Sequence, residues 1–246
     1  MLSSILLTAV QITEETSFDP IVYYWIAFIG IAIASWVVSY SLKHKFEKYS
    51  KESIRLTGKE VAEKMLRENG IDDVTVTCTS GQLTDHYNPL TKTVNLSESV
   101  YGCANVAAAA VAAHECGHAI QHQYAYAPLK LRSALVPVVS FSSSFVTWVI
   151  LAGLLLANHA GQVMLLIGIV LYAMITLFTF ITLPVEIDAS QRAVNWLEES
   201  GIVARDQRDM AVSALRSAAY TYVVAALSAL ATLLYYIMIF LGRSKN

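Results

Sequence analysis

The sequence predicts a mainly α-helical integral membrane protein with about four transmembrane helices and a small α+β domain. Of its 246 residues, 55% are hydrophobic and 15% are charged, whereas soluble domains average about 45–50% apolar and about 25% charged residues. Four apolar runs approach the length of about 20 residues that crosses a bilayer. The polar segment between the first two runs contains amphipathic and β-branched stretches, which predict the small domain.

The first apolar run predicts a transmembrane helix over residues 21–41, with Trp25 and Trp36 near its ends as expected at membrane interfaces. Positive residues follow this run directly, whereas residues 1–20 contain none. Because Lys and Arg favour the cytoplasmic side, we expect residues 1–20 outside the cytoplasm and residues 42–134 inside it. The positive cluster consists of Lys43, Lys45, Lys48, Lys51, Arg55 and Lys59.

Residues 42–134 predict two helices and two strands. Ser53 to Asn69 carries its apolar residues on one side, as an amphipathic helix does. Val74 to Cys78 and Thr91 to Leu96 have the alternation and β-branching of strands. Residues 85–89 are rich in turn-forming types. Ala104 to Gln123 predicts a long, Ala-rich helix.

The next two apolar runs, residues 135–157 and 163–183, are joined by a very short link, so we expect a transmembrane hairpin over 135–183. Its ends, Arg132 and Pro184, then lie on one side of the membrane. Residues 184–222 predict a cytoplasmic region of two helices broken near Gly201. Residues 223–241 predict the fourth transmembrane helix, followed by a tail over 242–246. This topology places 15 of the 17 Lys and Arg residues inside, and the two in the tail are the exception.

The Ala-rich helix contains His114-Glu115-Cys116-Gly117-His118, the pattern H-E-x-x-H. Residues four apart share a helix face, so the two histidines are candidate ligands of one metal ion and Glu115 is a candidate general base. A catalytic zinc site uses three protein ligands and one open position. The hairpin favours Glu186 as the third ligand, because it returns Glu186 to the membrane side of the histidines. The other candidates are Asp188, His122, His86 and Asp85.

Two residues near the motif are disfavoured as ligands by helix geometry. His122 lies about 12 Å along the axis from His114 at about 1.5 Å per residue, so we expect it beside the site rather than on the metal. Cys116 points away from the ligand face, and we expect a buried, apolar role for it.

The segments His114 to Gln121 and Pro184 to Ser190 together resemble the membrane neutral zinc metallopeptidases of the bacterial YugP type. The resemblance implies a zincin-like domain that holds one Zn²⁺ ion through His114, His118 and Glu186, with Glu115 as catalytic base. It implies cleavage of peptides or proteins, membrane proteins among them, at the cytoplasmic membrane of a bacterium. The HtpX and CAAX-prenyl membrane proteases are more distantly similar. They carry E-x-x-A-D where this chain has Glu186-Ile187-Asp188-Ala189-Ser190, so a role for Asp188 in orienting a ligand histidine stays open.

Peptide hydrolysis also needs a donor for the oxyanion and a surface for the substrate. The sequence does not choose a donor among His86, Tyr87, Tyr124 and Arg192. One of the two predicted strands is a candidate to pair with an extended substrate. The lipid bilayer is the other expected partner, and the net charge of −2 argues against nucleic-acid binding.

Two alternatives to a membrane-anchored endopeptidase remain at this point. In an intramembrane metalloprotease of the site-2 type, Val100 to Ile120 would itself cross the membrane, but this run has polar ends. In a non-catalytic scaffold, zinc would only brace the fold. Glu115 argues against the scaffold, because a structural zinc site has no need of a base.

Overall fold

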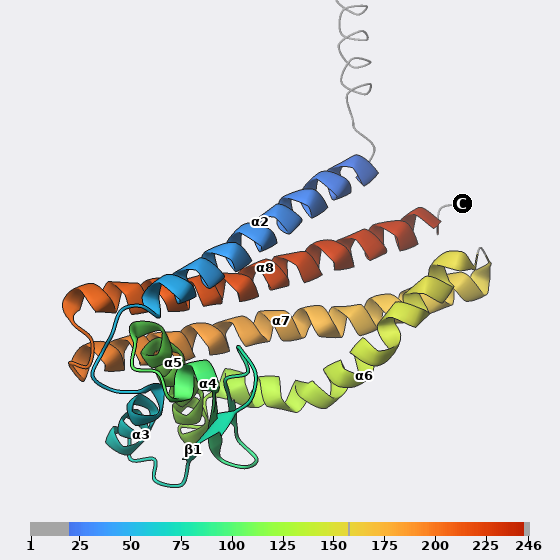
Figure 1. The fold of residues 1–246 in the computed structure, drawn as a ribbon. Coiled ribbons are helices and arrows are strands. Elements are labelled where there is room, and N and C mark those ends of the chain that lie inside the picture. Colours follow the sequence, from blue (N-terminus) through green and yellow to red (C-terminus); the bar gives the residue numbers. More distant parts are fainter. Residues whose placement is uncertain (1–19, 157, 244–246) are drawn as a thin grey trace, which may run out of the picture.

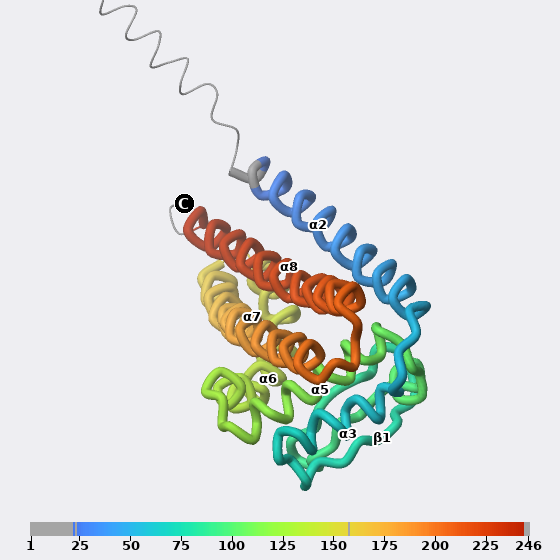
Figure 2. The backbone as a smooth tube through the Cα atoms, turned by 90° about the vertical axis from the view of Figure 1, so that its left-hand side faces the viewer, coloured from blue at the N-terminus to red at the C-terminus, as the bar shows by residue number. Residues whose placement is uncertain are grey.

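A computed structural model describes residues 20–156 and 158–243, and four long helices dominate it. These are α2 (Pro20–Tyr49), α6 (Ala127–Leu155), α7 (His159–Glu199) and α8 (Arg205–Arg243), and each is long and apolar enough to cross a membrane. Figures 1 and 2 show them side by side with a small domain at one end. They pack in the order α6, α7, α8, α2. The prediction of a mainly helical protein with four such helices is confirmed, and the predicted segment 1–20 falls almost wholly outside the described residues.

The small domain contains three helices and a three-stranded sheet. The helices are α3 (Gly58–Glu68), α4 (Glu98–Tyr101) and α5 (Val106–Gln123), and the strands are β1 (Thr75–Thr79), β2 (His86–Asn88) and β3 (Thr93–Ser97). The strand order is β1-β3-β2, with β1 parallel and β2 antiparallel to β3. The turn expected over residues 85–89 is wrong for three of these residues, because His86 to Asn88 form β2. Pairing with β3 overrides the local turn preference of Asn88, and the turn begins at Pro89.

The helix predicted from Ser53 begins five residues later, at Gly58. Thr57 caps it in a capping box with Glu60, an arrangement that stabilises a helix start. Ser53 instead pairs with Asn105, and Ile54 donates its N–H to the carbonyl of Ala104. The segment before Thr57 is therefore not helical, and it ties the end of α2 to the start of α5.

Helix α5 lies at the centre of the small domain, with α3 and the sheet packed on it and α7 alongside. Its alanines from Ala107 to Ala110, Ala112 and Ala113 are all buried. At Gly117 the helix approaches α7 closely, because a Cβ atom there would lie 2.6 Å from the carbonyl oxygen of Ala189. The absence of a side chain at Gly117 thus sets the separation of the two helices that carry the candidate ligands.

Helices α6 and α7 form the predicted hairpin. Asn158 caps α7 by accepting the N–H of Gly161, and Gly153 lets the backbone of α6 approach Leu165. Arg243, at the end of α8, donates to the carbonyl oxygens of Gly153 and Leu154, 2.7 Å from each. These contacts close the far end of the bundle.

Two helices run through boundaries that the hydropathy pattern suggests. Helix α7 continues through Pro184 to Glu199, and the chain breaks at Gly201, whose φ is +63°. Helix α8 then runs without interruption from Arg205. Helix α6 contains Pro137 and bends along its length (Figure 1), as expected where a proline removes a helix hydrogen bond.

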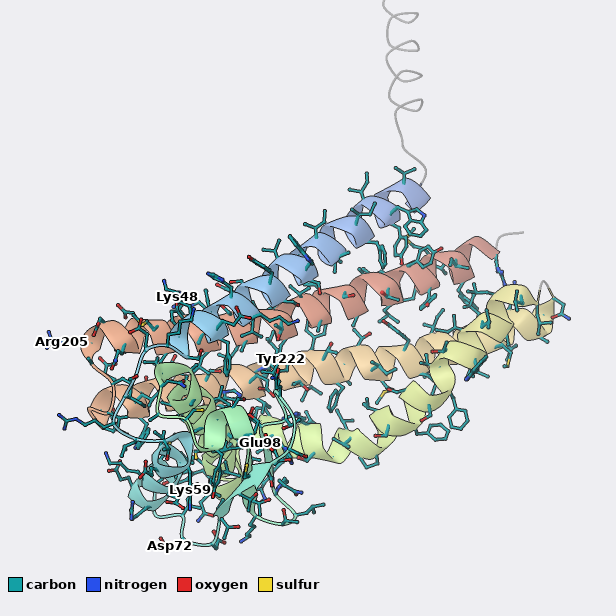
Figure 3. All side chains as sticks on the ribbon, viewed as in Figure 1. Lys48, Lys59, Asp72, Glu98, Arg205 and Tyr222 are labelled. Carbon is teal, nitrogen blue, oxygen red and sulfur yellow. The ribbon has the colours of Figure 1, made fainter. Side chains whose placement is uncertain are left out.

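Charged and apolar side chains divide along the long axis of the molecule. Figure 3 shows Lys48, Lys59, Asp72, Glu98 and Arg205 at the end that bears the small domain. Beyond them the long helices expose large apolar side chains, among them Trp36 and Trp148, which are 68% and 70% exposed. We expect an apolar surface of this extent to contact the lipid of a membrane rather than water.

Candidate metal centre

The H-E-x-x-H histidines and Glu186 converge where α5 meets α7. The Oε2 atom of Glu186 lies 3.3 Å from the Nε2 atom of His114 and 3.5 Å from that of His118. One ligand atom from each of the three residues can be chosen so that all lie within 4.8 Å of one another. Glu186 is 3% exposed, and among the described residues its Oε2 atom has no hydrogen-bond partner. A buried carboxylate oxygen without a donor is costly unless a cation binds it.

These separations fit one tetrahedral zinc ion. Ligand atoms about 2.0–2.1 Å from zinc lie about 3.3–3.4 Å from one another in a tetrahedron. The two measured contacts of Glu186 agree with that spacing. Two imidazoles and one carboxylate leave a fourth position open, as in catalytic rather than structural zinc sites. The residues present therefore fit the metal that the sequence implies.

In both histidines the Nδ1 atom, which points away from Glu186, also has a hydrogen-bond partner. Gln121 is fully buried and donates its amide N–H groups to the carbonyl of Val185 and to Asp188, each at 2.8 Å. Its amide oxygen must then accept from Nδ1 of His118, 3.0 Å away. This bond places the proton of His118 on Nδ1 and leaves Nε2 free to bind a metal.

His114 has a different partner. Its Nδ1 atom is 3.1 Å from the hydroxyl of Ser190. Ser190 lies four residues after Glu186, where the HtpX and CAAX-prenyl pattern has an aspartate. Asp188, the expected partner of a ligand histidine, reaches His118 only through Gln121 and is held by Arg192 at 2.7 Å. The sequence left open whether Asp188 orients a ligand histidine. In the structure Ser190 contacts His114 directly, whereas Asp188 contacts His118 only through Gln121.

Negative charge near the histidines shifts the proton affinity of His118. Burial alone lowers the pKa of this imidazole, but the carboxylates of Glu186 and Glu115 and the bond to Gln121 raise it. The net pKa lies above the ordinary value of histidine. The charge that attracts a proton to this ring also favours a metal cation in its place.

Glu115 faces the same space from α5. It is 8% exposed, and its Oε2 atom accepts the backbone N–H of Tyr87 at 3.1 Å. This bond joins β2 to the motif and fixes one carboxylate oxygen. The other oxygen is left to interact with water or substrate.

A cavity of about 680 Å³ contains the three candidate ligands and Glu115. Strand β2, the start of α6 and one residue of α8 complete its wall. The lining residues from these elements include His86, Tyr87, Lys130, Arg132, Val136 and Tyr222. A cavity of this size accommodates several residues of a peptide.

The remaining residues suggested by the sequence have other surroundings. His86 lines the cavity but is exposed and bonds the carbonyl of Thr84. The hydroxyl of Tyr87 bonds His122 at 3.0 Å, so His122 lies beside the site. Arg192 pairs with Asp188 and Tyr124 is 66% exposed, and neither is among the described residues that line the cavity.

Two further residues belong to the small domain's framework. Asp85 accepts the backbone N–H and the hydroxyl of Ser97 at 2.7 and 3.0 Å. It therefore holds the end of β3 and is not one of the three clustered candidate ligands. Cys116 is fully buried, with its Sγ atom 3.6 Å from the carbonyl oxygen of Ala62. Burial raises the pKa of its thiol, which suits the apolar role expected of it.

Four residues around the site were not singled out as site residues by sequence reasoning: Gln121, Ser190, Arg132 and Tyr222. Arg132 Nη1 lies 3.5 Å from Oε1 of Glu186, and Tyr222 lines the cavity beside Glu186. The i, i+3 spacing of His118 and Gln121 was a usable signal, because residues three apart share a helix face. Tyr222 gave none, since a tyrosine at the start of an apolar run is typical of a membrane interface.

The long apolar helices and the H-E-x-x-H helix completed by a distant glutamate define a membrane metallopeptidase of the zinc class. The family model described as "Putative neutral zinc metallopeptidase" matches residues 24–241. The chain is 40% identical over 229 residues to the "Putative membrane protease YugP" of Bacillus subtilis (strain 168), an alignment that covers 91% of this chain and 99% of that protein. The chain belongs to this neutral zinc metallopeptidase family. No solved structure matches it.

Proposed function

We propose that the chain is a membrane-anchored endopeptidase that holds one zinc ion through His114, His118 and Glu186 and hydrolyses peptide bonds at a cytoplasm-facing site. The observation that carries this proposal is the approach of Glu186 from α7 to both histidine Nε2 atoms. Helix α5 is not among the four described helices that suit a membrane span, and it packs against the sheet and α3. This placement favours an anchored peptidase over one whose motif helix crosses the membrane.

Each residue of the site then has a chemical task. Zinc, when bound, supplies a Lewis acid that polarises the scissile carbonyl and makes water more acidic. Glu115 accepts a proton from the attacking water and passes it to the departing amine. The N–H of Tyr87 holds the Glu115 carboxylate in place during both transfers. Gln121 and Ser190 fix the rotation of the histidine rings.

Strand β2 is the part of the sheet best placed to bind an extended substrate. The sequence offered the segments of β1 and β3, but β3 is the central strand and β1 is the other edge. Tyr87 directs its N–H away from β3 toward Glu115, and its carbonyl points the same way because both groups of a residue share one side in an antiparallel pair. That carbonyl is available to accept an N–H from a peptide lying in the cavity.

The charges support a cytoplasmic site. Lys48 and Arg205, from the two segments with most of the positive charge, lie at the same end of the molecule (Figure 3), and that end bears the metal cluster. Of the two positive residues in the C-terminal tail, Arg243 lies within the described part of the chain and is bonded to the carbonyls that end α6. Its position therefore serves the fold and is weak evidence against the positive-inside arrangement.

The test is metal content and casein cleavage by the purified, detergent-solubilised protein. We expect one zinc per chain and cleavage in the wild type, zinc without cleavage in Glu115→Gln, and loss of both in Glu186→Ala. The control Glu63→Gln changes an exposed acid on α3 and keeps full activity. Undiminished cleavage by Glu115→Gln contradicts the proposed base, and full zinc occupancy in Glu186→Ala contradicts the third ligand.

A further inference from the structure

Tyr222 and Arg132 bring two donor groups to Glu186 from helices that do not carry the motif. Arg132 lies near the start of α6 and Tyr222 lies within α8. Both line the cavity together with Glu115 and Glu186, and the Nη1 atom of Arg132 lies 3.5 Å from the Oε1 atom of Glu186. Figure 3 shows Tyr222 where the small domain meets the apolar part of the long helices.

Three of the four donors suggested by the sequence are engaged by other groups. The N–H of Tyr87 is bonded to Glu115 and its hydroxyl to His122. His86 bonds the carbonyl of Thr84, and Arg192 is paired with Asp188. Arg132 pairs with the Oε1 atom of Glu186, on the side of the carboxylate turned away from the histidines. Tyr126, Lys130 and Ser133 also line the cavity, but the charges of both Glu186 and Glu115 act on the phenol of Tyr222, which places this donor beside the reacting groups.

We propose that Tyr222 is a catalytic residue whose hydroxyl donates a hydrogen bond to the carbonyl oxygen of the scissile peptide as that oxygen becomes negative. Addition of water to the peptide carbon forms a C–O bond, breaks the C=O π bond and passes a proton to Glu115, so that negative charge appears on the former carbonyl oxygen. When the C–N bond breaks, the C=O bond is restored and the amine leaves with the proton from Glu115. A donor aimed at this oxygen stabilises the transition state more than the substrate.

The pair of Arg132 and Glu186 makes this role compatible with the structure. When the hydroxyl of Tyr222 donates to the substrate, Arg132 still compensates the charge of the Glu186 carboxylate from 3.5 Å. The hydroxyl can therefore serve the substrate without leaving an unpaired charge in the cavity. The arrangement keeps the donor in place before substrate arrives.

This inference rests on the proposed function, and Tyr222→Phe tests it because only the hydroxyl is removed. We expect zinc content and KM of the wild type, with kcat lowered about 10²- to 10³-fold, as for loss of one oxyanion donor. The matched control is Tyr220→Phe, which alters an exposed tyrosine two residues away on α8 and leaves kcat unchanged. A kcat of Tyr222→Phe within a few-fold of the wild type overturns the role.

A binding measurement separates this proposal from the proposed function. A peptide phosphinate, whose tetrahedral oxygens imitate the charged intermediate, is titrated into the zinc-loaded proteins. We expect Tyr222→Phe to bind it more weakly by the factor by which kcat falls, and to bind the uncleaved peptide in a Glu115→Gln background as before. Equal phosphinate affinity in the two proteins refutes the role of Tyr222 even if no peptide is ever hydrolysed. Absence of cleavage by the wild type counts against the proposed function instead.

Discussion

Gln121 connects the two helices that supply the proposed metal ligands. It is fully buried, and its amide contacts His118 on α5 and both Val185 and Asp188 on α7. A neutral amide in this position fixes the tautomer of the histidine without adding charge beside the metal. Asp188 and Arg192 stabilise the amide from outside, so the order His118, Gln121, Asp188, Arg192 runs from the buried centre toward the surface.

Replacing Gln121 by Met keeps the volume of the side chain and removes its three hydrogen bonds. We expect zinc affinity to fall about 10- to 100-fold, as for other groups that orient ligand histidines. Competition with a coloured chelator measures this, on protein that remains monodisperse. Gln123→Met, at an exposed position on the same helix, is the control. An unchanged affinity in Gln121→Met would show that the His118 ring needs no such partner.

At the scale of elements, the site depends on how closely α5 approaches α7. A Cβ atom at Gly117 would meet the backbone of Ala189, which cannot move aside as a flexible side chain can. The close packing of α5 against α7 therefore requires glycine at position 117. The same contact sets the distance from the histidines to Glu186.

Gly117→Ala therefore tests the helix pair directly. Overpacking of this kind costs about 1–3 kcal/mol, and we expect a lower Tm together with weaker zinc binding, because the histidines and Glu186 are pushed apart. Gly102→Ala is matched to it, since a Cβ there meets nothing within 4 Å and its φ is −95°. Equal Tm and zinc affinity in the two variants would mean that α7 adjusts freely.

Some helices and strands of the site could be predicted from the sequence, and others could not. The H-E-x-x-H helix and the hairpin follow from periodicity and length, and together they favour Glu186 as the third ligand from sequence alone. The contacts of Gln121, Ser190 and Tyr222 depend on how α7 and α8 are rotated about their axes. The sequence does not specify this rotation, because the apolar parts of both helices have no polar face. Strand β2 was missed because three residues carry too little alternation, and its pairing with β3 is a tertiary effect.

At the scale of the whole molecule, the metal cluster and most of the positive charge lie at one end of a bundle whose flanks are apolar. Cysteine labelling tests which side of the membrane this end faces. Cys78 is exposed on β1 and Cys116 is buried. We expect a membrane-impermeant maleimide to label Cys78 in inside-out vesicles and to leave it unlabelled in intact spheroplasts.

Two variants calibrate that experiment. Cys78→Ser removes the labelled thiol and reports any contribution from Cys103, which is partly buried. Adding Ala160→Cys to it places an exposed thiol at the hairpin end, where labelling is expected in spheroplasts. Labelling of Cys78 in intact spheroplasts would contradict the cytoplasmic placement of the site, while leaving the peptidase chemistry untouched.

The division of the site among four helices has a consequence for biosynthesis. A ribosome completes α5, with both histidines, before it reaches Glu186 on α7 and Tyr222 on α8. Until the hairpin has inserted and returned Glu186 to α5, the nascent chain has two of the three proposed ligands, and the donor from α8 arrives later still. A chain released early, or one whose hairpin fails to insert, therefore lacks the complete proposed site, and we expect it to have no peptidase activity until it is correctly inserted in the membrane.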